Sequence, residues 1–220
     1  MAKVCLIRPG CTDFDEQHRI QGSLDLPLNP RGQQQVDQLI DQLRGLELKI
    51  IYTSVSEPAR ATAEAIGESL NVPVRELDGL RNFDQGLWQG LQIDEIRRKF
   101  PRVLKQWKES PASICPPEGE TVQEAVERVS RALRKPMKRR SAFAVVVSEP
   151  IATLVRCVIQ HCDSHTPGPI CGDVNLQRLE ILQVGVGGNA GDNGAALQSA
   201  ARQSKQISTA ANAGWEGRTQ

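Results

Sequence analysis

The stretch that decides the fold is residues 3–12, Lys-Val-Cys-Leu-Ile-Arg-Pro-Gly-Cys-Thr. A short apolar run that stops at proline and glycine is typical of a strand buried on both faces in a parallel sheet. Arg8 then lies at the carboxyl end of that strand. Because open α/β sheets bind ligands at the carboxyl ends of their strands, the sequence predicts a site beside Arg8.

Length and charge favour a single domain with an appendage. The chain has 220 residues, 39% of them hydrophobic, so it can bury one substantial core. Its formal net charge is +1, from 27 basic and 26 acidic residues, which provides no global field toward nucleic acid or an anionic membrane. The sequence contains no run of about 18 apolar residues and no apolar leader. We therefore expect a cytoplasmic protein without nucleic-acid or membrane partners.

The six cysteines are scattered, without a Cys-x-x-Cys pair or the His and Cys spacing of a zinc site. This pattern favours a reducing compartment, and we expect neither a metal nor a cofactor. Cys5 and Cys157 are expected to be small core residues, because free cysteine is commonly buried. Cys11 stands apart because it lies close to Arg8.

Beyond the first strand, helical and strand patterns alternate. Asn29-Pro30 supplies a cap and a first-turn proline for a helix that ends near Gly45. The other expected elements are a strand at 48–54, a helix at 58–70, a short edge strand at 72–74, a helical segment from 93 interrupted near 101, a helix at 121–133, a strand at 142–148, a helix at 150–159 and a strand at 176–184. Residues 13–27 and 77–90 are expected to be loops. This alternation predicts a three-layer α/β/α sandwich with a mainly parallel sheet.

The last part of the chain differs in composition. Residues 186–220 are mostly Gly, Ala, Asn, Ser and Gln without a sustained apolar period, so burial cannot offset the entropy of ordering them. We therefore predict a folded domain at residues 1–185 and a low-complexity, flexible tail at residues 186–220.

Several segments carry a family resemblance in addition to Arg8-Pro9-Gly10. Residues 54–64 read Ser-Val-Ser-Glu-Pro-Ala-Arg-Ala-Thr-Ala-Glu, and residues 80–90 read Leu-Arg-Asn-Phe-Asp-Gln-Gly-Leu-Trp-Gln-Gly. Residues 145–150 are a valine run followed by Ser-Glu-Pro. Together with residues 19–32 and 117–121, these segments resemble, in the same order, the histidine phosphatase superfamily, which includes the cofactor-dependent phosphoglycerate mutases. The resemblance implies a phosphoglycerate mutase-like fold.

The same resemblance implies a changed active site. In the family, a turn histidine attacks a phosphoryl group and carries it as phosphohistidine, which needs an unprotonated ring nitrogen. That histidine aligns with Pro9, which has no such atom. Of the groups that hold the phosphoryl oxygens, the second arginine aligns with Pro58 and the second histidine with Glu149, while the family's proton-donating glutamate aligns with Asn82. The resemblance therefore implies that no residue performs phosphohistidine catalysis.

Arg8 keeps its family position, and Glu149 changes what it can bind. A carboxylate about 4 Å from a phosphate oxygen costs about 4 kcal/mol at an effective dielectric near 20. We therefore predict that Glu149 pairs with Arg8 and competes with any anion. The resemblance implies that the ligand-binding residues are Arg8, Gly10, Thr12, Gln21, Gly22 and Glu149.

The sequence leaves three functions open. The favoured hypothesis is a catalytically inactive pseudoenzyme that binds a small phosphorylated or other anionic ligand, or a protein partner. The alternative is a phosphatase or phosphomutase of altered mechanism, in which Arg8 acts with Cys11 or His18. Arg8 would then lower the pKa of the Cys11 thiol, although a passive loop thiol is the favoured interpretation of that residue. The third is a purely structural or assembly role.

Overall fold

The computed structural model describes residues 3–102, 115–139, 141–162 and 175–184. These residues form a 5-stranded sheet of order β3-β2-β4-β1-β5. The strands are β1 (Lys3–Ile7), β2 (Ile51–Thr53), β3 (Val74–Glu76), β4 (Phe143–Val146) and β5 (Leu179–Gln183). The β1–β4, β2–β4 and β2–β3 pairs are parallel, and β5 runs antiparallel to β1. The predicted mainly parallel sheet is confirmed, and the strand after Pro73 lies at its edge.

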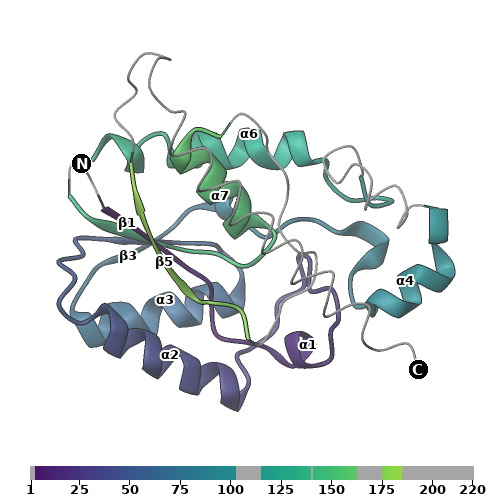
Figure 1. Cartoon of the computed structure of the whole chain (residues 1–220), viewed down its shortest axis with the longest axis horizontal. Coiled ribbons are helices and arrows are strands. Elements are labelled where there is room, and N and C mark those ends of the chain that lie inside the picture. The colour runs from purple at the N-terminus through teal and green to yellow at the C-terminus, as the bar shows by residue number, and fades with distance from the viewer. Residues whose placement is uncertain (1–2, 103–114, 140, 163–174, 185–220) are drawn as a thin grey trace, which may run out of the picture. The chain divides into compact units, whose positions relative to one another are not determined.

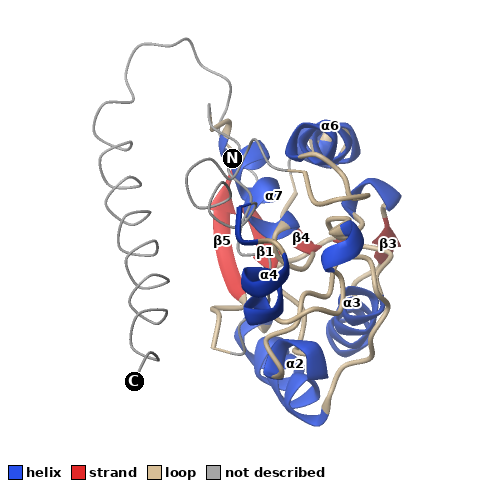
Figure 2. Ribbon diagram, turned by 90° about the vertical axis from the view of Figure 1, so that its right-hand side faces the viewer, coloured by secondary structure: helices blue, strands red, loops and turns tan. Residues whose placement is uncertain are grey.

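Helices cover both faces of the sheet. α2 (Pro30–Leu43) and α3 (Glu57–Leu70) lie on one face, and α6 (Val122–Leu133) and α7 (Ile151–Gln160) lie on the other (Figure 1). Figure 2 shows the strands between these two helical layers. The shorter elements are α1 (Asp13–Glu16), α4 (Ile93–Lys99) and the 3-10 turns η1 (Asp78–Leu80), η2 (Gly86–Trp88) and η4 (Pro136–Lys138). The three-layer α/β/α sandwich is therefore confirmed.

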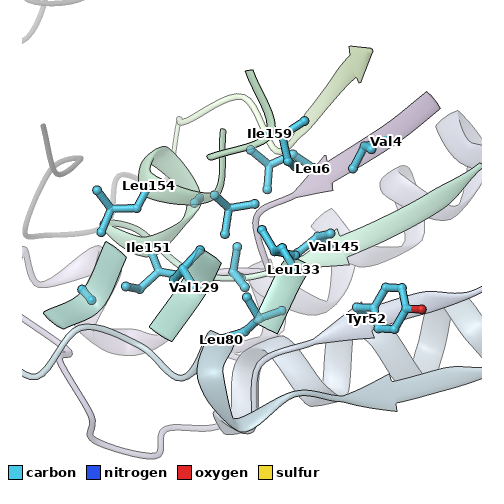
Figure 3. Packing of buried hydrophobic residues seen from close by; sticks show 14 of the residues in the cluster. Val4, Leu6, Tyr52, Leu80, Val129, Leu133, Val145, Ile151, Leu154 and Ile159 are labelled. Carbon is cyan, nitrogen blue, oxygen red and sulfur yellow. The ribbon is translucent and has the colours of Figure 1, made fainter. Parts of the chain in front are cut away.

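The apolar run of β1 serves two cores. Val4 and Leu6 belong to the cluster under α6 and α7, whereas Cys5 and Ile7 belong to the cluster under α2 and α3. Figure 3 shows Leu6 and the strand residue Val145 among the apolar side chains of α6 and α7. Because successive side chains of a strand point to opposite faces, a central strand with helices on both faces must be apolar at every position. Cys5 and Cys157 are buried as predicted.

One short helix was not predicted. Residues 13–27 were expected to form a loop, but Asp13–Glu16 form α1. The backbone N–H and Oγ1 of Thr12 donate to Oδ2 of Asp15 at 2.6 and 3.0 Å, which closes the first turn of this helix. A helix of 4 residues is too short to show an apolar period, so the sequence pattern could not reveal it.

Two of the predictions concern residues that the structure does not describe. α4 ends at Lys99, and the expected continuation of its helical pattern past residue 102 lies outside the described residues. The expected tail at residues 186–220 also lies outside them. Within the part of the chain that is described, no helix is both long enough and apolar enough to cross a membrane.

Candidate functional site

The sheet register brings the two ends of the predicted site together. Ile7 lies opposite Val146 in the parallel pair of β1 and β4, and the Val147 N–H donates to the Ile7 carbonyl at 3.0 Å. Arg8 and Glu149 therefore leave adjacent strands at the same edge of the sheet. This is the carboxyl edge, where α/β sheets bind ligands.

Arg8 and Glu149 form the predicted ion pair. Nε of Arg8 lies 2.7 Å from Oε1 of Glu149, with 9% and 3% of the two side chains exposed. The other carboxylate oxygen accepts the backbone N–H of Thr153 at 3.1 Å and its hydroxyl at 2.9 Å. Since Thr153 lies in the first turn of α7, the Glu149 carboxylate also caps that helix. Both of its oxygens are therefore engaged.

Further negative charge surrounds the Arg8 guanidinium. Nη1 of Arg8 donates to the Gln177 carbonyl at 3.3 Å and lies 3.7 Å from Oε2 of Glu180. Two carboxylates thus face one guanidinium, so its charge is already balanced within the protein. An incoming phosphate would have to compete with both carboxylates for Arg8.

A small cavity lies beside this ion pair. Its volume is about 40 Å³, and its walls include five of the six predicted ligand-binding residues, namely Arg8, Gly10, Gln21, Gly22 and Glu149. Pro9 and Pro58 line it as well. Cavities for drug-sized ligands measure roughly 300–1,000 Å³, and one water needs about 10–15 Å³. The space in this structure therefore suits a group of only a few atoms.

The turn after β1 packs against α2 and α3. The Gly10 N–H donates to Oγ1 of Thr62 in α3 at 3.1 Å. A Cβ atom at Gly10 would lie 2.4 Å from the carbonyl oxygen of Gly32 in α2, which is closer than real contacts allow. Glycine at this position therefore lets the turn pack directly on the backbone of α2.

Two residues at motif positions lie outside the described lining of the cavity. Thr12 is fully buried, and its donors are used by Asp15. Asn82 donates from Nδ2 to the Gly22 carbonyl at 2.8 Å and accepts the Phe83 N–H at 2.9 Å. Both residues therefore support the loops around the cavity, and the structure does not bring them into its wall.

Neither proposed substitute nucleophile is placed for attack. Cys11 is 1% exposed, and its thiol donates to Oδ1 of Asn29 at 3.3 Å. Burial raises the pKa of the Cys11 thiol, which disfavours the reactive thiolate. His18 is exposed and lies outside the described lining.

Sequence reasoning missed three polar groups in the wall of the cavity, Arg178, Ser148 and Asp15. Nη1 of Arg178 donates to the Pro9 carbonyl, and burial lowers the pKa of this guanidinium. No motif signals Arg178, because residues 176–184 show only the pattern of a strand. It reaches the site through the register of β5, whose Leu179 lies opposite Ile7 of β1. Among the described residues, no group of three acidic, histidine or cysteine side chains could hold a metal ion.

Comparison with known proteins places the chain in a family. The family model described as histidine phosphatase superfamily (branch 1) matches residues 4–174. Phosphoserine phosphatase 1 of Hydrogenobacter thermophilus is 31% identical over 147 residues, which cover 67% of this chain and 70% of the relative. This chain therefore belongs to the histidine phosphatase superfamily.

Two further comparisons agree with this assignment. The uncharacterized phosphatase PhoE of Bacillus subtilis is 32% identical over 135 residues, which cover 61% of this chain and 64%, just under two thirds, of that relative. The solved structure of Bacillus stearothermophilus YhfR superimposes with a TM-score of 0.71 at 24% identity, covering 87% of this chain and 98% of that one. The phosphoglycerate mutase-like fold is thus confirmed.

Proposed function

We propose that this chain is a catalytically inactive member of its superfamily that binds a small ligand at the carboxyl edge of the sheet. The observation that carries the proposal is the buried pair of Arg8 and Glu149, with 2.7 Å between the nearest nitrogen and oxygen. It neutralises the cation that the resemblance assigns to phosphoryl binding. Pro9, at the neighbouring position, has no atom that could carry a phosphoryl group.

The competing function is a phosphatase or phosphomutase that uses Arg8 with Cys11 or His18. The names of the relatives favour some phosphatase chemistry, since two of them are called phosphatases. The geometry weighs against it, because the Cys11 thiol is buried and hydrogen-bonded, and His18 lies outside the described cavity lining. A small anionic ligand is therefore our choice over a phosphate-ester substrate.

We also propose that the protein works in the cytoplasm. All five of the described cysteines carry free thiols, including the exposed Cys115. Free thiols are typical of proteins kept in a reducing compartment.

Steady-state assays on p-nitrophenyl phosphate, phosphoserine and 3-phosphoglycerate test the proposal. We expect phosphate release at the rate of a protein-free blank, and no phosphorylated protein by intact-mass spectrometry. Arg8→Ala and Cys11→Ser are the matched variants. Turnover that Arg8→Ala abolishes would replace our proposal with the phosphatase alternative, and its response to Cys11→Ser would then tell Cys11 from His18 as the residue that acts with Arg8.

A further inference from the structure

Two polar atoms of the cavity wall are left without a hydrogen bond. Nη2 of Arg178 and Oγ of Ser148 are both buried, and neither finds a partner among the described residues. Both residues line the cavity beside Arg8 and Glu149. Because buried polar groups in proteins are nearly always hydrogen-bonded, a pair of unsatisfied atoms on one cavity indicates a ligand that provides the missing acceptors.

The other charged groups of the wall are already engaged. Oδ2 of Asp15 accepts both donors of Thr12, and the Glu149 carboxylate accepts from Arg8 and Thr153. Arg178 uses Nη1 on the Pro9 carbonyl and keeps Nη2 for a further acceptor. Among the fully buried side-chain atoms of this wall, the unused capacity is therefore one guanidinium nitrogen and one hydroxyl group.

The charge of the wall limits the charge of the ligand. Arg8 and Arg178 are the two cations in the described lining, and Asp15 and Glu149 are its two anions. Glu149 pairs with Arg8, whereas Asp15 acts on Arg178 through its charge, without an ion pair or hydrogen bond between them in the described part of the chain. Arg178 is therefore the cation of this lining with a buried donor left for a ligand. A second negative charge on the ligand would face carboxylates without a further cation to balance it.

We propose that this cavity binds the carboxylate group of a small monoanionic ligand, which accepts hydrogen bonds from Nη2 of Arg178 and from the hydroxyl group of Ser148. The inference rests on the proposed function, since it names the ligand class of the same site. A flat carboxylate group of three heavy atoms suits a cavity of about 40 Å³ better than a tetrahedral phosphate does. Arginine is also well matched to carboxylates, because its guanidinium is planar and always charged.

Isothermal titration with sodium acetate and with inorganic phosphate, at pH 7.5 and matched ionic strength, tests the ligand class. We expect saturable binding of acetate, with phosphate at least 10-fold weaker. Thermal melts should show the same order, because a ligand that binds the folded state raises the melting temperature by mass action. Phosphate binding as tight as acetate, or no acetate binding at all, would overturn the inference.

Variants of the wall test the assigned groups. Arg178→Gln should lower the affinity for acetate at least 10-fold, and Ser148→Ala should lower it several-fold. Arg44→Gln is the matched control, because Arg44 pairs with the exposed Asp41 at 3.1 Å and lies outside the described lining. Acetate affinity that is unchanged in Arg178→Gln would refute the assignment.

The sharpest test removes a negative charge beside Arg8, because this should reverse the preference for acetate over phosphate. Glu149→Gln frees Arg8 from its main counter-charge. The affinity for phosphate should therefore rise at least 10-fold and exceed the affinity for acetate. Glu180→Gln should act in the same direction by a smaller factor, and it serves if Glu149→Gln does not fold. If neither variant moves the preference toward phosphate, the charge argument fails. Turnover of phosphate esters would instead refute the proposed function and leave acetate binding to be judged by the titration alone.

Discussion

Two buried arginine–glutamate pairs occupy different regions of the domain and differ in how many hydrogen bonds they form. Nε of Arg128 lies 2.9 Å from Oε2 of Glu120, and its Nη2 lies 2.5 Å from Oε1, so the two side chains meet through two parallel hydrogen bonds. The rest of the Arg128 guanidinium donates at 2.8–3.3 Å to three backbone carbonyls, those of Gly79, Arg81 and Asn82. This pair joins α6 to the loop that follows β3.

The pair at the carboxyl edge of the sheet is less complete. Arg8 meets Glu149 through one hydrogen bond of 2.7 Å and donates to one carbonyl, that of Gln177. Unsatisfied atoms of Arg178 and Ser148 lie in the wall of the same cavity. The contrast separates two uses of a buried charge. A saturated pair fixes two segments to each other, whereas the pair beside unsatisfied donors lies where we propose that a ligand binds.

The largest expected effect of a substitution is at the saturated pair. Arg128→Ala removes both hydrogen bonds that the buried Glu120 carboxylate accepts from Arg128, and it removes the donors of three carbonyls. Among the described residues, Glu120 keeps only the Asp84 N–H at 3.0 Å and Arg81 at 3.9 Å, so we expect a loss of about 3–5 kcal/mol in the free energy of unfolding. Urea denaturation followed by far-UV circular dichroism measures it. The matched control is Arg131→Ala on the exposed face of α6, which should stay within about 0.5 kcal/mol of the wild type. A loss below about 1 kcal/mol for Arg128→Ala would contradict the structural role of this pair.

A smaller effect is expected at the cavity. Glu149→Ala removes three hydrogen bonds, one from Arg8 and two from Thr153, against the five that Arg128→Ala removes, and Glu180 still lies 3.7 Å from Arg8. We therefore expect a loss of about 2 kcal/mol in the same urea experiment. The double variant Arg8→Met/Glu149→Leu should recover most of that loss, because replacing both partners of a buried pair by apolar residues is often neutral. A larger loss for Glu149→Ala than for Arg128→Ala would reverse the comparison.

Much of the fold could be predicted because its signals are local. The apolar residues 4–7 and 142–147 identify two central strands, and Asn29-Pro30 marks the start of α2, where Asn29 accepts the Gly32 N–H at 2.8 Å. The pairing of Arg8 with Glu149 followed from the resemblance, which places these residues after neighbouring strands. Two opposite charges that are buried at the same edge of the sheet have few other partners, so they pair with each other.

The rest of the site depends on long-range register. Arg178 lies beside Arg8 because β5 pairs antiparallel with β1, and the Arg8 N–H donates to the Arg178 carbonyl at 2.8 Å. Nothing in the order of residues 176–184 specifies that partner strand or its direction. Thr12 was expected to bind ligand by resemblance, but the structure uses it to cap α1, a helix too short to be seen in the sequence.

The smallest expected effect concerns the start of α6, the helix that carries Arg128. The Glu124 carboxylate accepts the Thr121 N–H and hydroxyl, both at 2.8 Å. The backbone hydrogen bond, followed by the one from the hydroxyl, holds the pKa of Glu124 below its usual value of 4.5. A carboxyl group whose pKa is lowered by folding adds stability above its unfolded pKa, and this stability is lost as the pH falls through the folded value.

Glu124→Gln should therefore melt at a lower temperature than the wild type at pH 7, by less than either ion-pair variant, because Glu124 is exposed. The difference should persist down to about pH 5 and shrink below 4.5 as the wild-type carboxyl group becomes protonated. Glu127→Gln, which removes one charge from the exposed face of the same helix, is the matched control. Thermal melts between pH 3 and pH 7 measure both variants. A difference that grows in acid would mean that the Glu124 carboxylate is not stabilised by the cap, and that α6 depends on Arg128 and its apolar face alone.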